Sequence, residues 1–174
     1  QIAVFFMDIS GRKKAEEAVR TSEEKLRSFL DNVDDMVYLI GLDQSISGMN
    51  RSIEKVTGFL QEEYKNDPEL WVSMIHPSDK PQIDAFFASE AGKAEKYDIE
   101  YRLKNKYGHW RWIQSRMVAA RNETGEVIGY NCIDRDITNL RMAEEERQKL
   151  EAQVQHVQKL ESLGVMAGGI AHDF

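Results

Sequence analysis

The chain has 174 residues, of which 41% are hydrophobic and 30% charged, a balance typical of a globular domain with amphipathic helical extensions. Its formal net charge of -7 argues against a nucleic-acid-binding protein, because no basic stripe is present to neutralise phosphates. A single cysteine, Cys132, excludes an internal disulfide, and no apolar run approaches the length of a membrane span. We therefore expect a cytoplasmic piece of a longer protein, and a membrane attachment of that parent stays open.

A short motif near the start of the chain recurs near the end of its central region. Asp8-Ile9-Ser10 followed by Ala15-Glu16-Glu17 reappears as Asp136-Ile137-Thr138 followed by Ala143-Glu144-Glu145. The spacing suits tandem domains joined by a helix. It predicts that residues 1–9 are the tail of a preceding, similar domain and form its last strand.

A linker helix is predicted over residues 10–31, with Ser10 as its N-cap. Thr21-Ser22 is a candidate interruption, and the helix should stop at Asp31-Asn32. Two interpretations remain open, a solvated helix or a dimer-forming coil. Both rest on a partial apolar stripe at helical spacing, which comprises Ala15, Val19, Leu26, Phe29 and Leu30.

Residues 32–138 change to strands around short helices. Two short strands are predicted first, at Met36–Ile40 and Ser45–Met49. Short helices follow at Asn50–Thr57, at Gln61–Lys65, after Asp67-Pro68, and at Lys80–Ala91, where Ser78 or Asp79 can cap the amides.

Three longer strands complete this region. Tyr97, Ile99, Tyr101 and Leu103 alternate with charged residues, as in a half-buried strand. Turns at 105–108 and 122–125 lead into strands at 110–120 and 127–137. This order predicts an α+β domain with a five-stranded antiparallel sheet and helices on one face.

The arrangement resembles the PAS domain of sensor kinases over roughly residues 22–140, and the PAS sensor domain itself is assigned to residues 32–138. The residues that carry the likeness are Trp71, Ile75-His76-Pro77-Ser78-Asp79, Tyr101-Arg102-Leu103, Arg111-Trp112-Ile113, Gly129-Tyr130 and Asp136-Ile137-Thr138. The resemblance implies a sensor that binds a small molecule, flavin or haem, or a dimeric relay that binds nothing.

Individual cofactor signatures are weak. Cys132 lies in the last strand, away from the place of a flavin-reactive cysteine, and is interpreted as a small buried residue. Helix 80–91 has no histidine to bind haem, and neither His76 nor His109 has a neighbour at metal spacing. We expect no metal and assign no certain cofactor, so the PAS ligand is unknown. Three aromatic residues are interpreted as core packing, with ligand contact as the alternative: Tyr38, Trp71 and Tyr101.

The segment 139–158 shows heptad steps of three and four. Its repeat consists of Leu140, Ala143, Arg147, Leu150, Val154 and Val157. This spacing predicts a two-stranded coiled coil with a polar Arg147 in the seam. The register shifts at Leu160 and Leu163, which favours either a coil that switches between two packings or a slightly irregular rigid coil.

The segment 159–174 places a histidine beside a carboxylate. Its apolar stripe leaves out His172, and its three glycines indicate close packing or a bendable helix. The segment resembles the H-box of sensor histidine kinases, in the variant where Asp-Phe follows the histidine. The resemblance implies that His172 accepts the γ-phosphoryl group of ATP and passes it to an aspartate of a response regulator. It also implies that Asp173 orients the imidazole and manages its proton.

Together these features predict the PAS sensor module of a sensor histidine kinase, homodimeric through its flanking helices. ATP would bind to a kinase domain of the parent that this sequence lacks, so we expect the segment alone to be inactive. Two alternatives remain: a ligand- or cofactor-binding sensor with an output other than phosphorylation, and a dimerisation spacer.

Overall fold

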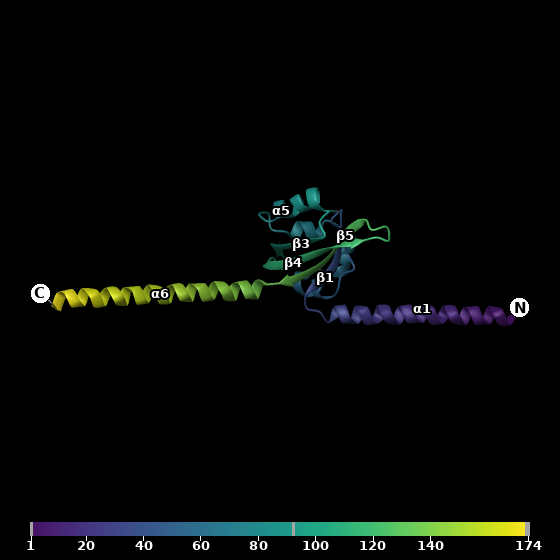
Figure 1. Ribbon diagram of the computed structural model, residues 1–174, viewed down its shortest axis with the longest axis horizontal. Helices are drawn as coiled ribbons and strands as arrows, with labels where there is room; N and C mark the ends of the chain where they lie inside the picture. Colours follow the sequence, from purple (N-terminus) through teal and green to yellow (C-terminus); the bar gives the residue numbers. More distant parts are fainter. Residues whose placement is uncertain (1, 92, 173–174) are drawn as a thin grey trace. The chain divides into compact units, whose positions relative to one another are not determined.

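The computed structural model describes residues 2–91 and 93–172. The chain divides into two compact units, Gln1–Asp136 and Ile137–Phe174. The second unit contains the helix α6 (Thr138–His172). The first unit contains the other elements (Figure 1): α1 (Ile2–Asp31), β1 (Met36–Gly41), β2 (Ile46–Ser47), α2 (Ser52–Thr57), α3 (Gln61–Asn66), α4 (Leu70–Met74), α5 (Lys80–Ala85), the π-helix η1 (Phe86–Glu90), β3 (Lys96–Lys104), β4 (Trp110–Arg121) and β5 (Val127–Asp136).

The sheet has five strands in the order β2-β1-β5-β4-β3, and each neighbouring pair is antiparallel. This confirms the predicted α+β class, the five-stranded sheet and the long helices that flank it in sequence. The last strand, β5, lies in the middle, between β1 and β4. Asp134 of β5 is therefore opposite Met36 on one side and opposite Ser115 on the other.

The hydrophobic core lies between one face of the sheet and the short helices. The alternation predicted for β3 is confirmed, because Ile99, Tyr101 and Leu103 are buried while their sequence neighbours are more exposed. The helical layer contributes Trp71 from α4 and Ile83 from α5 to the same core.

The Asn50 side chain connects the end of α1 to the sheet by hydrogen bonds. Its side chain is 3% exposed, and its Nδ2 donates to the carbonyls of Leu30 at 2.9 Å and Asp35 at 3.0 Å. Its Oδ1 accepts the Val37 N–H at 3.0 Å. One buried amide thus satisfies backbone groups of the last helical turn and of β1.

Three predictions for the first thirty residues are wrong, because α1 is a single helix from Ile2 to Asp31. The strand expected at residues 2–9 is helical. A strand needs a partner for its backbone groups, and none of the described strands pairs with this segment. Ser10 is inside the helix, so it caps no helix start. The break at Thr21-Ser22 is absent, since the Thr21 hydroxyl donates to the Glu17 carbonyl at 2.8 Å within the helix.

The helix predicted at Lys80–Ala91 differs in two respects. It changes after Ala85 into the π-helix η1, where the Ala91 N–H donates to the Phe86 carbonyl at 2.8 Å. The cap prediction is also wrong, because Asp79 occupies the N-cap position without a side-chain cap bond. Its carboxylate instead receives two hydrogen bonds from the Arg102 guanidinium, at 2.7 and 2.9 Å.

The second unit presents apolar side chains on the surface of α6. Leu140, Leu150 and Val154 are between 55% and 69% exposed. Arg147 forms ion pairs with Glu144 and Glu151 of the same helix. None of the helices among the described residues is long and apolar enough to cross a membrane.

Candidate sensory core

A carboxylate occupies the middle of the buried face of the sheet. Asp134 is on the central strand β5 and is 1% exposed. Its Oδ2 accepts the hydroxyl of Tyr38 from β1 at 2.7 Å and the hydroxyl of Tyr101 from β3 at 2.8 Å. The carboxylate therefore connects three strands through one oxygen atom.

This carboxylate has no balancing cation within the part of the chain that the structure describes. Among the described residues, Asp134 takes part in no ion pair, and its Oδ1 has no hydrogen-bond partner. Arg111, whose position in the β4 alternation puts it on the same face as Ser115, lies 3.7 Å from Asp136 instead. A buried charge without a counter-charge is unfavourable, which makes this group the most unusual feature of the core.

Burial raises the pKa of Asp134 to about 6, and the hydroxyls of Ser115, Tyr38 and Tyr101 only partly oppose this by favouring the ionised form. Burial also raises the pKa of both tyrosines well above their usual value, so each phenol keeps its proton near neutral pH. Both tyrosines therefore remain hydrogen-bond donors over the range in which Asp134 titrates.

A small cavity adjoins the carboxylate. Its volume is about 10 Å³, which corresponds to about one water molecule. Tyr101 and Ser115 border both the cavity and Asp134. The complete lining is Trp71, Ile83, Phe86, Tyr97, Ile99, Tyr101, Ser115 and Met117. Four of the eight residues that line this cavity are aromatic, and the cavity leaves no room for a larger ligand in this conformation.

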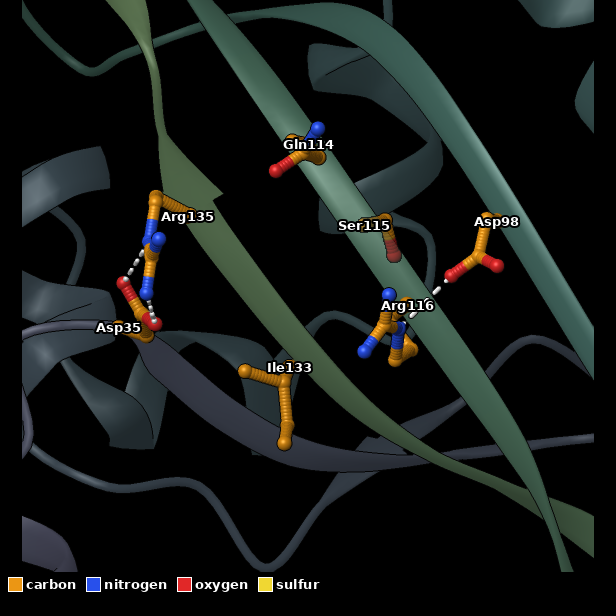
Figure 2. Close-up of a pocket in the computed structure, with 7 residues that line it drawn as sticks. All are labelled: Asp35, Asp98, Gln114, Ser115, Arg116, Ile133 and Arg135. Carbon is orange, nitrogen blue, oxygen red and sulfur yellow. Dashed lines mark hydrogen bonds and ion pairs between the residues drawn. The ribbon is translucent and has the colours of Figure 1, made fainter.

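A second, more open hollow of about 430 Å³ lies at the solvent-exposed side of the sheet (Figure 2). Its charges are already paired: Arg135 contacts Asp35 at 2.9 Å and Arg116 contacts Asp98 at 2.9 Å. The seven lining residues are Asp35, Asp98, Gln114, Ser115, Arg116, Ile133 and Arg135. A charged ligand would have to compete with these ion pairs, whereas the core carboxylate has no charged partner among the described residues.

The residues weighed as cofactor ligands are accounted for individually. Cys132 is a free thiol whose burial raises its pKa, and this burial confirms its interpretation as a small buried residue. His76 accepts the Ser78 N–H through Nδ1 at 3.1 Å, beside the Trp110 ring, and His109 is exposed in its turn. The described residues contain no group of three or more metal-binding side chains. Tyr38, Trp71 and Tyr101 are buried, as their packing interpretation predicts.

The two predicted catalytic residues cannot be compared with this core. His172 is the last residue of α6, and its side chain is not among those described. Asp173 lies outside the described residues. Both assignments therefore remain predictions.

Sequence reasoning missed Asp134, because the motif that carries the resemblance in this strand, Asp136-Ile137-Thr138, begins two positions later. The alternation of β5 contained the signal. Tyr130, Cys132 and Asp134 share one face of the strand, and two buried residues in alternate positions predict that the third is buried as well. A charged residue at such a position marks a site that needs a partner or a proton.

Known proteins with a similar sequence or fold place this geometry in context. The family model described as the PAS fold matches residues 46–133. The peroxide stress-activated histidine kinase mak3 of Schizosaccharomyces pombe is 27% identical over 139 residues, 78% of this chain and 6% of mak3. The sensor protein FixL of Bradyrhizobium diazoefficiens is 23% identical over 171 residues, 97% of this chain and 33% of FixL. The chain thus spans at most a third of either relative.

A solved structure supports the same fold. The PAS domain of a protein from Colwellia psychrerythraea has 27% sequence identity and a TM-score of 0.58. That comparison covers 67% of this chain and 97% of the Colwellia domain. The part of the chain that matches is therefore a complete domain of that kind.

Proposed function

We propose, because this chain belongs to the PAS family, that it is the sensory segment of a sensor histidine kinase. In this proposal the PAS fold receives a stimulus and a dimeric coiled coil carries it along α6. The phosphoacceptor is His172, and the receiver domain of a response regulator is the final acceptor.

The observation that carries the proposal is the direct passage from β5 into α6. Only Ile137 separates the end of the central strand from the first residue of the helix. The helix then continues without interruption to His172, which at 1.5 Å per residue is roughly 50 Å of helix. In this proposal, a change in β5 acts on His172 through one uninterrupted helix, α6.

The exposed side chains of α6 support a dimer. Leu140, Leu150 and Val154 follow the heptad spacing and remain exposed in a single copy of the helix. An apolar stripe of this period is buried when a second helix of the same kind packs against it. We therefore propose that residues 139–158 form the coil with a second copy of this chain.

The chemistry assigned to the end of α6 is a two-step transfer. A nitrogen of the His172 imidazole attacks the γ-phosphorus of ATP held by the kinase domain of the parent. The bond to the leaving ADP oxygen breaks, an N–P bond forms, and Asp173 takes up the imidazole proton. A carboxylate of the receiver domain then attacks the same phosphorus, the N–P bond breaks, and Asp173 returns the proton, so that the imidazole leaves in its neutral form.

The relatives support this context. One of them is by name a histidine kinase and another a sensor protein, and the match to the sensor protein covers 97% of this chain. Such coverage includes most of α6 in addition to the PAS fold. Because the chain spans only a fraction of each relative, the kinase activity is proposed for the whole parent protein.

Labelling of the intact parent with γ-phosphate-labelled ATP tests the assignment. We expect His172→Gln to abolish acid-labile phosphate on the protein, because the acceptor nitrogen is lost. His156→Gln is the matched control, since His156 is also on α6 and is exposed. Retained labelling of the His172→Gln protein, or loss of labelling in the control alone, would contradict the proposal.

A further inference from the structure

We propose that the Asp134 carboxyl is a proton-binding site whose occupancy sets how tightly Tyr38 and Tyr101 tie β1 and β3 to β5. The proton site stands on the structure of the core alone. Its use as a signal input rests on the proposed function.

The hydrogen-bond partners of Asp134 are neutral groups. Both hydrogen bonds to its Oδ2 come from hydroxyl groups, at 2.7 and 2.8 Å, and its Oδ1 has no partner among the described residues. Hydroxyls stabilise an anion but carry no charge. A fully buried carboxylate with only neutral partners is stabilised by taking up a proton, because neutralisation removes the desolvation cost.

Among the described residues, no strand around Asp134 contributes a cation that forms an ion pair with it. β1 contributes Tyr38, and Asp35 before it adds a negative charge that disfavours ionisation of Asp134. β3 contributes Tyr101 and β4 contributes Ser115, neither of which is cationic. On β5 itself the nearest buried titratable neighbour is the Cys132 thiol.

Two further charged groups belong to the same end of the sheet. Arg111 on β4 shares the face of Ser115, and its guanidinium contacts Asp136 at 3.7 Å. Arg135 is on the opposite face of β5 and forms its ion pair with Asp35. Among the described side chains, therefore, both candidate cations are engaged with carboxylates other than Asp134.

The core accommodates both the ionised and the protonated form of the Asp134 carboxyl. Ser115 lies directly opposite Asp134 in the register of β4 and β5. Its hydroxyl can rotate, so it can donate to an ionised carboxylate or accept the O–H of a protonated one. The two tyrosine bonds to Oδ2 are charge-assisted only in the ionised form, and bonds of that kind are about twice as strong as neutral ones. Proton uptake thus weakens the two hydrogen bonds that connect β1 and β3 to β5, while each bond keeps its donor and its acceptor.

The pKa of Asp134 sets the pH range in which the carboxyl takes up its proton. Burial places the pKa of Asp134 at about 6, against an ordinary value of 3.8. This difference corresponds to a proton affinity roughly 100-fold above that of an exposed aspartate. The carboxyl therefore changes charge around pH 6.

The proton site is tested by carbon-detected NMR titration of the aspartate carboxyls in the 174-residue chain. We expect the Asp134 signal to titrate with a midpoint near 6. Tyr38→Phe should raise the midpoint, because it removes a donor that favours the ionised form. Asp98→Asn is the control, since Asp98 pairs with Arg116 on the exposed face and its loss should leave the midpoint in place.

Two results would overturn the proton site. One is an Asp134 midpoint at or below that of the exposed aspartates. The other is a Tyr38→Phe protein in which the midpoint is unchanged or lower. Since Tyr38→Phe keeps the ring in the core, the test does not depend on whether Asp134→Asn folds.

The role as an input is tested separately in the intact parent. We expect phosphate labelling to change between about pH 5 and about pH 7, and Asp134→Asn to remove that change while it leaves labelling itself in place. Equal pH profiles of the two proteins would overturn the input role. Loss of the His172 assignment would instead appear as labelling that persists in His172→Gln, so the two failures are distinguishable.

Discussion

At the scale of single residues, Asp134 links the pH to the stability of the fold. The folded chain binds this proton more tightly than the unfolded chain, because burial raises the pKa from 3.8 to about 6. Between these values the folded state carries a proton that the unfolded state has lost. Stability from this group therefore falls as the pH rises through the window from about 4 to about 6 and is constant above it.

The predicted size of this effect is roughly 3 kcal/mol, from a pKa difference of about two units at 1.36 kcal/mol per unit. We expect the wild-type chain to lose about this much relative to Asp134→Asn when the pH rises from about 4 to about 7. Urea denaturation at several pH values measures the difference, and subtraction of the variant removes the contribution of the other carboxylates. Parallel curves for the two proteins would show that Asp134 titrates normally.

The residues of the core were only partly predictable. Alternation along a strand is enough to place Tyr101 in the interior, and the interpretation of the single cysteine as a small buried residue is correct. The hydrogen bond between Tyr38 and Asp134 joins residues 96 positions apart, and it depends on β5 lying beside β1. No local pattern specifies that lateral order, so the polar centre emerged only from the structure.

At the scale of elements, the strands and short helices followed their sequence patterns more closely than the first helix did. The boundaries of β1, β3, β4 and β5 agree with the predicted alternation and turns to within a few residues. The strand expected at residues 2–9 rests on the recurrence of a short motif. Such a recurrence indicates sequence similarity, but it does not provide a neighbouring strand as a hydrogen-bonding partner. The π-helix η1 was not foreseen because a change from α to π leaves the apolar spacing almost the same over one turn.

The pairing of β1 with β5 provides a prediction at this scale. A Cβ atom at Gly129 would meet the Ile40 carbonyl oxygen of the neighbouring strand, so the two backbones must separate. We expect Gly129→Ala to reduce the free energy of unfolding by about 1 to 3 kcal/mol, the range for overpacked sites. The measurement is urea denaturation of the purified chain.

Gly11→Ala is the matched control for this substitution. A Cβ there meets nothing within 4 Å, and the position is in the helix α1. Alanine should therefore be neutral or stabilising at that site. A Gly129→Ala chain as stable as the wild type would show that β1 and β5 do not approach as closely as described.

At the scale of the whole molecule, one helix, α6, joins the sensor fold to the proposed phosphoacceptor. The buried carboxylate is on the central strand, and α6 follows that strand after one residue. Proton uptake changes the strength of the hydrogen bonds around β5 and needs no ligand to enter a cavity of about 10 Å³. The response then depends on two copies of α6 packed together, since a helix that packs against nothing has no second arrangement to adopt.

The most direct test of this relay is the distance between spin labels on the two copies of α6. Ala152→Cys provides an exposed attachment site, whereas the buried Cys132 thiol should stay unlabelled. We expect the distance distribution between the labels of a dimer to differ between about pH 5 and about pH 7, and to be the same at both when Asp134→Asn is present. A chain that gives no distance between copies, or one whose distribution is identical at the two pH values, would contradict the account.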